Sequence, residues 1–307
     1  MPTLLDYRRR IRSVKNTQQI TRAMKFVSAA KLRRAQEGVF RARPYAKEIR
    51  RVLRSAMQRV SEPQHPLLER REERRILAVV VTSDKGLCGA FNTNVLRKTS
   101  EFLREQHGKE VQVIAVGRRG VENLRRRRGK LAGEWQNVSM HVEFRHAEEI
   151  SKRISEIYAL HEADAVYAIY NEFKSVIVQK LVVEKLLPLD PELLLHERTG
   201  EKFATETAEH AAESAKLAGT VDYIYEEPPE EIFADLVPRY LETEVFRVLL
   251  ESAAAEHAAR MTAMDAATTN AGELITDLTL DMNRIRQASI TKEIIEIVSG
   301  AAFAASS

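Results

Sequence analysis

The sequence has one cysteine, few aromatic residues and no long apolar run. Its single cysteine, Cys88, excludes an intramolecular disulfide and favours a reducing compartment. No stretch approaches the roughly 18 consecutive apolar residues that cross a bilayer, and the first ten residues lack the apolar core of a secretory signal. Aromatic residues make up 6% of the chain and charged residues 30%, which suits long helices with solvated faces better than one large globular core. We therefore expect a chain that is neither exported nor inserted in a membrane.

Glycine and proline are also scarce, but only at the two ends of the chain. Residues 4–60 contain only Gly38 and Pro44, and the tract from Pro238 to residue 299 contains only Gly272. Apolar residues recur at helical spacing in the first tract, at Leu4, Ile11, Val14, Ile20, Met24 and Val27. Two heptad series run through the second tract, one being Met264, Ala271, Leu278 and Ile285, and the other Ala267, Leu274, Asp281 and Ala288. These patterns predict two long helices that pack as an antiparallel coiled coil.

The two ends carry opposite charge. Residues 1–60 hold 17 Lys and Arg against 3 Asp and Glu, a net charge of +14, whereas residues 231–307 hold 6 against 12, a net charge of −6. Opposite net charges favour pairing of the two terminal helices.

The middle of the chain has a different residue pattern. Apolar runs rich in β-branched residues predict strands at residues 76–82, 111–117 and 165–170, and helices are expected at residues 93–106 and 148–161. Because the runs are almost continuously apolar, the strands should be buried on both faces in a mainly parallel sheet. The predicted domains are an N-terminal coiled-coil helix over residues 1–60, an α/β domain over 61–230 and a C-terminal coiled-coil helix over 231–307.

A loop at residues 83–92, SDKGLCGAFN, lies where ligand loops occur in α/β folds, between a strand and a helix. Its glycines, Gly86 and Gly89, form neither a dinucleotide fingerprint nor a P-loop. Cys88 is a candidate nucleophile, but a packed small residue is the favoured interpretation. The eight histidines form no metal-binding motif, so we expect no catalytic, cofactor or metal site.

Basic runs at residues 8–10 and 125–128 raise a competing hypothesis, binding to nucleic acid. Neither aromatic residues between the charges nor a known reader motif supports it. An enzyme that uses Cys88 is the third hypothesis.

The last segment is apolar on most sides of a helix. Its apolar residues are Ile290, Ile294, Ile295, Ile297, Val298, Ala301, Ala302 and Phe303. A helix end that is apolar nearly all round has to be enclosed by other protein. Either it folds back on the central domain, or another subunit forms a sleeve around it.

Four segments, taken in order along the whole chain, resemble the gamma subunit of F-type ATP synthases. They are KNTQQITRAMKFVSAAKLRRA (15–35), SDKGLCGAFN (83–92), ARMTAMDAATTNA (259–271) and RQASITKEIIEIVSGA (286–301). The resemblance implies an α/β fold plus a long antiparallel coiled coil, in which the N- and C-terminal helices form the shaft and a central Rossmann-like domain forms the foot. It implies as partners three alpha and three beta subunits around the shaft, with the epsilon subunit and the membrane ring of c subunits at the foot.

The same resemblance implies a central-stalk rotor that couples transmembrane proton flow to ATP synthesis or hydrolysis on the beta subunits and makes or breaks no bond itself. It needs no cofactor, binds no nucleic acid, and meets the membrane only through the complex, on the cytoplasmic side of a bacterial inner membrane. The resemblance assigns subunit-interface and coupling roles to Met24, Arg260, Gln287, Thr291, Ile294, Ile297 and Val298, and foot contacts to Tyr223 and Glu226. For Met24 the alternative is packing within the coiled coil, and for Arg260 it is a solvated charge. The stretch 201–219 is longer than the family's minimal pattern, and no regulatory insertion with cysteines is present.

Overall fold

A computed structural model of the chain describes residues 3–57, 65–126, 130–189 and 228–305. Two long helices form its ends, α1 (Leu4–Met57) and α7 (Pro229–Ala305). Thr3 and Asp6 cap the start of α1 by exchanging hydrogen bonds of 2.9 and 3.3 Å between backbone N–H groups and side-chain oxygens. Both long helices predicted from the sequence are confirmed.

The helix start inferred at Pro238 is wrong, because α7 begins at Pro229 and contains Pro238. Proline removes one intrahelical hydrogen bond, which made it a plausible boundary. Phe233 and Val237 precede it and are buried in the core, so their burial offsets that loss.

The chain divides into two compact units. One consists of Met1–Ser28 together with Arg260–Ser307, and the other is Ala29–Ala259. Parts of α1 and α7 belong to each unit. The division at residues 60 and 230 follows the expected helix ends and stays a prediction.

The unit Ala29–Ala259 is built around a five-stranded sheet in the order β3-β2-β1-β4-β5. Its strands are β1 (Arg75–Val81), β2 (Glu110–Val116), β3 (Leu131–Trp135), β4 (Ala165–Phe173) and β5 (Gln179–Leu187). Strands β1 to β4 run parallel, and β5 pairs antiparallel to β4. The predicted parallel sheet and its three predicted strands are confirmed. The two edge strands were not predicted, because they are only partly buried and lack a continuous apolar run.

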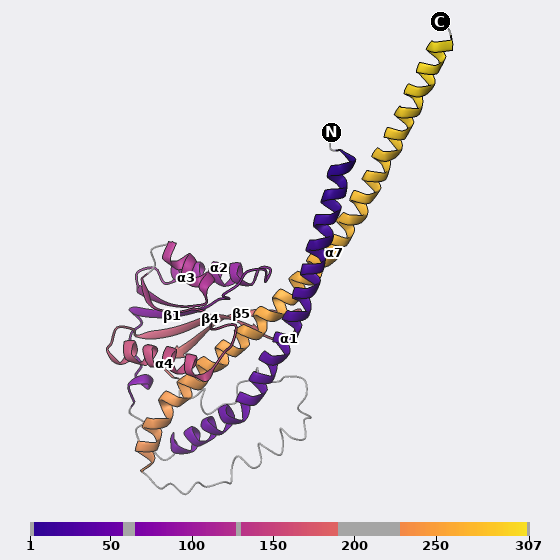
Figure 1. Cartoon of the computed structure of the whole chain (residues 1–307). Helices are drawn as coiled ribbons and strands as arrows, with labels where there is room; N and C mark the ends of the chain where they lie inside the picture. The colour runs from indigo at the N-terminus through magenta and orange to yellow at the C-terminus, as the bar shows by residue number, and fades with distance from the viewer. Residues whose placement is uncertain (1–2, 58–64, 127–129, 190–227, 306–307) are drawn as a thin grey trace. The chain divides into compact units, whose positions relative to one another are not determined.

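Helices cover both faces of the sheet (Figure 1). The helices α2 (Phe91–Glu105) and α3 (Arg118–Arg126) pack on one face, and α4 (Phe144–Ala159) and α7 pack on the other. A one-turn 3-10 helix, η1 (Pro66–Leu68), also contacts α4. The helices predicted at residues 93–106 and 148–161 are confirmed as α2 and α4, each starting a few residues earlier. The fold expected for this region, a Rossmann-like α/β domain, is therefore confirmed.

The largest apolar cluster lies on the α4 and α7 side of the sheet. Its residues on α7 include Phe233, Leu241 and Val245, and α1 contributes Ile49 and Leu53. Within Ala29–Ala259, both long helices are thus part of the domain core.

In the other unit, α1 and α7 pair antiparallel through a seam with alternating steps of three and four residues. Buried or half-buried positions on α1 are Leu4, Tyr7, Ile11, Val14, Gln18, Thr21, Lys25 and Ser28. Those on α7 are Met264, Thr268, Ala271, Ile275, Leu278, Met282 and Ile285. The first predicted heptad series is confirmed.

The second predicted heptad series is wrong by one residue at three of its four positions, whereas Ala267 is half-buried. Leu274, Asp281 and Ala288 are exposed, and Ile20 and Val27, expected in the stripe on α1, are exposed as well. A heptad repeat can begin with a step of three or of four residues, and the repeat alone does not say which comes first. The prediction took the step of three from Met264, because it leads to small or apolar residues, and the structure has the step of four. Two of the positions that do lie in the seam, Thr21 and Thr268, are polar. Their hydroxyl groups form a hydrogen bond of 2.7 Å with each other across the seam.

Candidate functional site

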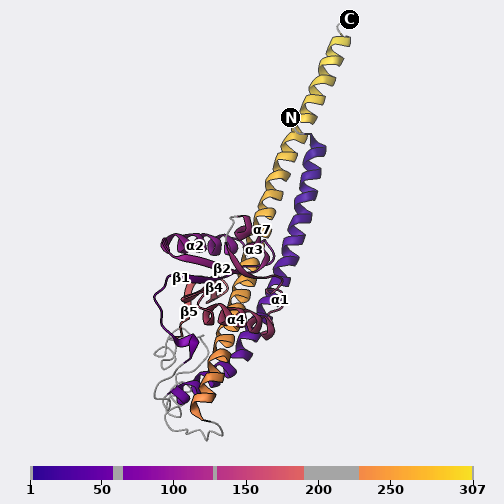
Figure 2. The ribbon, with the colours of Figure 1, turned by 90° about the vertical axis from the view of Figure 1, so that its left-hand side faces the viewer.

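The last turns of α7 present a cluster of exposed apolar side chains, which we call the α7 tip: Ile290, Ile294, Ile295, Ile297 and Val298. These side chains are 48–71% exposed. Two views agree that α7 continues beyond the start of α1 within their shared unit (Figures 1 and 2). These side chains are exposed, and the two options for covering them, the central domain or a sleeve of other subunits, stay predictions. A group of exposed apolar side chains gathered at one helix end is typical of an interaction site.

A second apolar cluster, which the sequence reading missed, lies on the outer side of α1. Ile20, Phe26 and Val27 are 57–62% exposed. The signal that could have found it is the adjacent pair Phe26–Val27, since only one of two neighbouring helix positions can face the seam. This surface belongs to the same unit as the tip.

The seam itself is polar where α1 passes Thr268. Besides the contact between the two threonine hydroxyl groups, Gln18 Nε2 donates to the Thr268 carbonyl at 3.3 Å, and Lys25 Nζ pairs with Asp265 at 2.6 Å. Gly272 makes room for Gln18, because a Cβ at that position would lie 3.0 Å from Gln18 Nε2. These contacts fix the register of the two helices while leaving apolar side chains on the outside.

The coupling residues inferred from the resemblance fall into two groups. Gln287 and Thr291 are exposed and lie on the turns that carry the α7 tip, together with Ile294, Ile297 and Val298. Met24 is half-buried beside the seam, and Arg260 is buried, so the interpretation of Arg260 as a solvated charge is wrong. Their coupling roles stay predictions.

Tyr223 and Glu226, the inferred foot contacts, lie outside the described residues, as does the stretch 201–219.

The loop at residues 83–92 is held together by its own side chains. Cys88 is buried, and Asn92 Nδ2 donates to Cys88 Sγ at 3.2 Å and to Ser83 Oγ at 2.7 Å. Burial and these contacts support the packing interpretation of Cys88.

Asp84 in the same loop ties together the ends of three strands. Its carboxylate accepts hydrogen bonds from the backbone N–H groups of Arg118 (3.0 Å), Asn137 (2.7 Å) and Ser139 (3.1 Å), and from the Ser139 hydroxyl (2.9 Å). Gly117 lies beside this junction at φ 91°, where a Cβ would come within 2.2 Å of the Thr82 carbonyl oxygen. The loop is a structural junction at the ends of three strands.

Across the residues that the structure describes, no group of His, Cys, Asp and Glu side chains is arranged to hold a metal ion. Within those same ranges, none of the helices has the length and apolar character needed to cross a membrane.

Comparison with known proteins adds independent evidence. The family described as ATP synthase matches residues 3–303. The chain is 51% identical to the ATP synthase gamma chain of Solibacter usitatus, over 99% of this chain and 100% of that one, and 45% identical to the gamma chain of Pelotomaculum thermopropionicum, over 98% and 99%. The chain belongs to the ATP synthase gamma-chain family. The family suggested by the four sequence segments is confirmed, and with it the rotary function expected of a gamma subunit of ATP synthase.

Solved structures agree with this membership. The central stalk of the mitochondrial ATP synthase of Tetrahymena thermophila superposes with a TM-score of 0.58 at 26% identity, covering 81% of this chain and 99% of that one. A chain of the Euglena gracilis mitochondrial ATP synthase superposes with a TM-score of 0.65 at 19% identity, covering 97% and 93%, which supports the fold. The fold class inferred for the gamma family, an α/β domain with a long antiparallel coiled coil, is confirmed.

Proposed function

We propose that this gamma-family chain is a non-catalytic shaft whose α7 tip turns inside a sleeve formed by three alpha and three beta subunits. In this proposal its α/β domain meets the epsilon subunit and the ring of c subunits, and proton flow through the membrane turns the whole chain. ATP is made or hydrolysed on the beta subunits. The assembly lies on the cytoplasmic side of a bacterial inner membrane, which this chain meets only through its partners.

The observation that carries the proposal is the exposed α7 tip. Branched aliphatic side chains leave water favourably but offer no directional hydrogen bonds, so a sleeve can enclose them without holding one angle strongly. The two helices of the shaft also expose different apolar side chains, namely Ile20, Phe26 and Val27 on α1 and Leu274 and Leu280 on α7, so the shaft surface is asymmetric.

That asymmetry supports coupling. A single asymmetric shaft in a ring of three like sites presents a different surface to each site, and different contact energies favour a different conformation at each. Rotation then changes which site binds nucleotide tightly. Gln287 and Thr291 are proposed as exposed contacts that make these energies unequal, and Met24 and Arg260 as packed side chains that support the shaft surface.

The proposal is tested by native mass spectrometry of the complex purified through a tag on this chain. We expect one copy with three copies each of two nucleotide-binding subunits. A monomer or homodimer that retains nucleic acid in low salt would refute the proposal and support the competing hypothesis.

A variant sharpens this test. Ile297→Asp places a charge in the α7 tip, and we expect it to weaken assembly about tenfold or more, because the carboxylate must leave water in the sleeve. Asn270→Asp adds the same charge at an exposed position of the same helix and serves as the control. Equal assembly of both variants would contradict a sleeve around the tip.

A further inference from the structure

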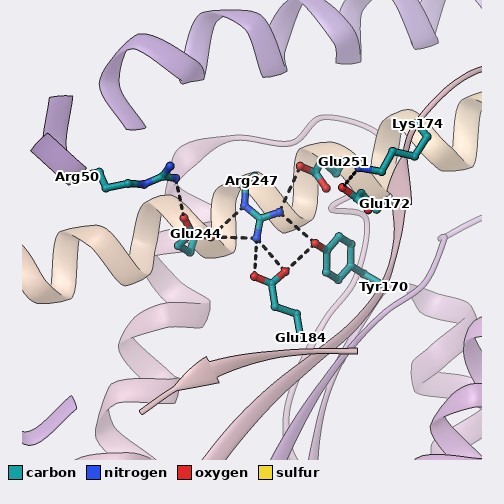
Figure 3. A network of polar contacts seen from close by, with 8 residues as sticks. All are labelled: Arg50, Tyr170, Glu172, Lys174, Glu184, Glu244, Arg247 and Glu251. Carbon is teal, nitrogen blue, oxygen red and sulfur yellow. Dashed lines mark hydrogen bonds and ion pairs between the residues drawn. The ribbon is translucent and has the colours of Figure 1, made fainter. Parts of the chain in front are cut away.

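A buried guanidinium joins α7 to the edge of the sheet (Figure 3). Arg247 on α7 donates through Nη2 to both carboxylate oxygens of Glu184 on β5, at 3.0 and 2.9 Å. Its Nη1 donates to the Tyr170 hydroxyl on β4 at 3.0 Å and to Glu251 on α7 at 3.2 Å, and its Nε donates to Glu244 at 2.9 Å. All five donor positions of one side chain are therefore directed at four fixed groups.

The cluster extends to the other long helix. Arg50 on α1 pairs with Glu244 at 3.4 Å, and Tyr170 donates its own proton to Glu184 at 2.8 Å. We call Arg50, Tyr170, Glu184, Glu244, Arg247 and Glu251 the Arg247 cluster. It connects α1, α7, β4 and β5, and all of its members lie within the compact unit Ala29–Ala259.

The electrostatics keep the cluster charged and rigid. Burial alone would lower the pKa of Arg247, but the carboxylates of Glu244, Glu251 and Glu184 raise it well above the ordinary value. Burial raises the pKa of the Tyr170 phenol, which therefore keeps its proton and donates it to Glu184. A planar guanidinium that is shielded from water and held by different partners at Nε, Nη1 and Nη2 has one preferred orientation.

Many of the other side chains that α7 buries in this unit are apolar and make non-directional contacts. The buried residues on this part of the helix include Val237, Leu241, Val245, Val248 and Leu249. Apolar packing resists separation of two elements more than it resists a small rotation of one against the other. A buried ion cluster is weak evidence for added stability, and its best-attested role is to fix register.

We propose that Arg247 is a positioning residue that fixes the angle of α7 against β4 and β5, so that rotation passes between the shaft and the α/β domain without slip. This inference rests on the proposed rotor function. It assigns to the cluster a mechanical task that apolar packing alone performs poorly.

The test uses the assembled complex in membrane vesicles and three variants. Arg247→Met removes the charge and the five donors but keeps most of the side-chain length, Arg247→Lys keeps the charge without the fork, and Lys174→Met is the control. Lys174 pairs with Glu172 at the nearby end of β4 and is more exposed, so its replacement removes one positive charge without touching the cluster.

The first readout is proton pumping per ATP hydrolysed, followed by quenching of a pH-sensitive dye. We expect Arg247→Met to keep ATP hydrolysis but to lower pumping per ATP about twofold, because it removes the directional contacts together with the positive charge that holds Glu184, Glu244 and Glu251 in place. Arg247→Lys should recover part of the loss, and Lys174→Met should match the wild type. Unchanged pumping per ATP in Arg247→Met would overturn the inference.

The second readout is the angular fluctuation of a bead fixed to the α/β domain while the hexamer is held on a surface. A larger fluctuation in Arg247→Met, with partial recovery in Arg247→Lys, supports the inference, and equal fluctuation overturns it. If Arg247→Met does not assemble, Glu184→Gln decides in the same two assays, because it weakens the fork while leaving every other member in place. Failure of the rotor proposal would appear differently, as absence of the wild-type chain from the complex.

Discussion

The same two helices are built differently in the two compact units of the chain. Within Ala29–Ala259, α1 and α7 bury large apolar residues such as Leu53, Val245 and Leu249 in a domain core. In the unit formed by Met1–Ser28 and Arg260–Ser307, the middle of the seam carries polar side chains, and Ile20, Phe26 and Val27 point outward.

The first unit buries its apolar surface within the chain, whereas the second leaves apolar surface that other subunits would have to cover. The core of Ala29–Ala259 removes its apolar surface from water within the chain, as an independent domain must. The coiled-coil unit has hydrogen bonds in the middle of its otherwise mostly apolar seam, and it leaves further apolar side chains exposed on its outside. Substitutions should therefore affect folding in the first unit and assembly in the second.

The largest expected contrast is between two leucine-sized residues on α1. Leu53→Ala should lower the free energy of unfolding by about 4 kcal/mol, because Leu53 is fully buried and its loss leaves a cavity. Ile20→Ala should change it by less than about 0.5 kcal/mol, because Ile20 is exposed. Urea unfolding of the purified chain, followed by circular dichroism, measures both. Equal losses would mean that the outer side of α1 is part of a core.

The second expected effect concerns the polar junction in the α/β domain. Asp84→Ala should lower the free energy of unfolding by about 3 kcal/mol, because it leaves three backbone N–H groups without their acceptor. Asp84→Asn keeps one carbonyl oxygen as an acceptor and should lose about half as much. The same unfolding experiment checks both variants. A loss no larger for alanine than for asparagine would show that water replaces the carboxylate.

The elements that could be predicted from the sequence are those whose burial is visible as a pattern of apolar residues. Strands β1, β2 and β4 are covered on both faces and read as continuous apolar runs, whereas the edge strands β3 and β5 do not. The α7 tip could also be recognised in the sequence, because its apolar residues cover more of the helix circumference than a single buried face requires.

The missed features depend on contacts between distant segments. A heptad repeat does not show whether Ala267 or Thr268 lies at the centre of the seam. The hydroxyl contact between Thr21 and Thr268 shows it, and that contact is visible only in the structure. The Arg247 cluster was missed for the same reason, since its members come from four elements and each is one polar residue in a chain that is 30% charged.

The third expected effect tests whether the polar seam sets register rather than stability. Replacing both Thr21 and Thr268 by valine removes two hydroxyl groups together and keeps the side-chain shape. We expect the free energy of unfolding to stay the same or to rise by about 1 kcal/mol, because no buried group loses its partner. Thr21→Val alone is the matched single change. A large loss in the double variant would show that the hydroxyl contact stabilises the helix pair.

The smallest expected effect is a pH dependence confined to the Arg247 cluster. Burial raises the pKa of Glu251 above its ordinary value of 4.5, against the opposing influence of Arg247. The second oxygen, Oε2, is buried with no hydrogen-bond partner among the described residues. The folded chain therefore binds this proton more readily than the unfolded chain does. As the pH falls from neutral through the raised pKa, the wild type should gain stability from this group until the unfolded chain is protonated too.

Glu251→Gln has no titrating carboxylate at this position. Comparing it with the wild type therefore isolates the contribution of Glu251 to the pH dependence of stability. The amide removes the buried negative charge and keeps an acceptor for Arg247, so the variant should exceed the wild type in unfolding temperature most at neutral pH. That difference should shrink as the pH falls toward the ordinary value of 4.5. Glu273→Gln, at an exposed position of the same helix in the other unit, is the control and should leave the pH profile unchanged. If Glu251→Gln and the wild type gave parallel profiles, the carboxylate of Glu251 would have to be as well solvated as an exposed one, and the contrast between a sealed domain core and an open coiled coil would not hold at this end of α7.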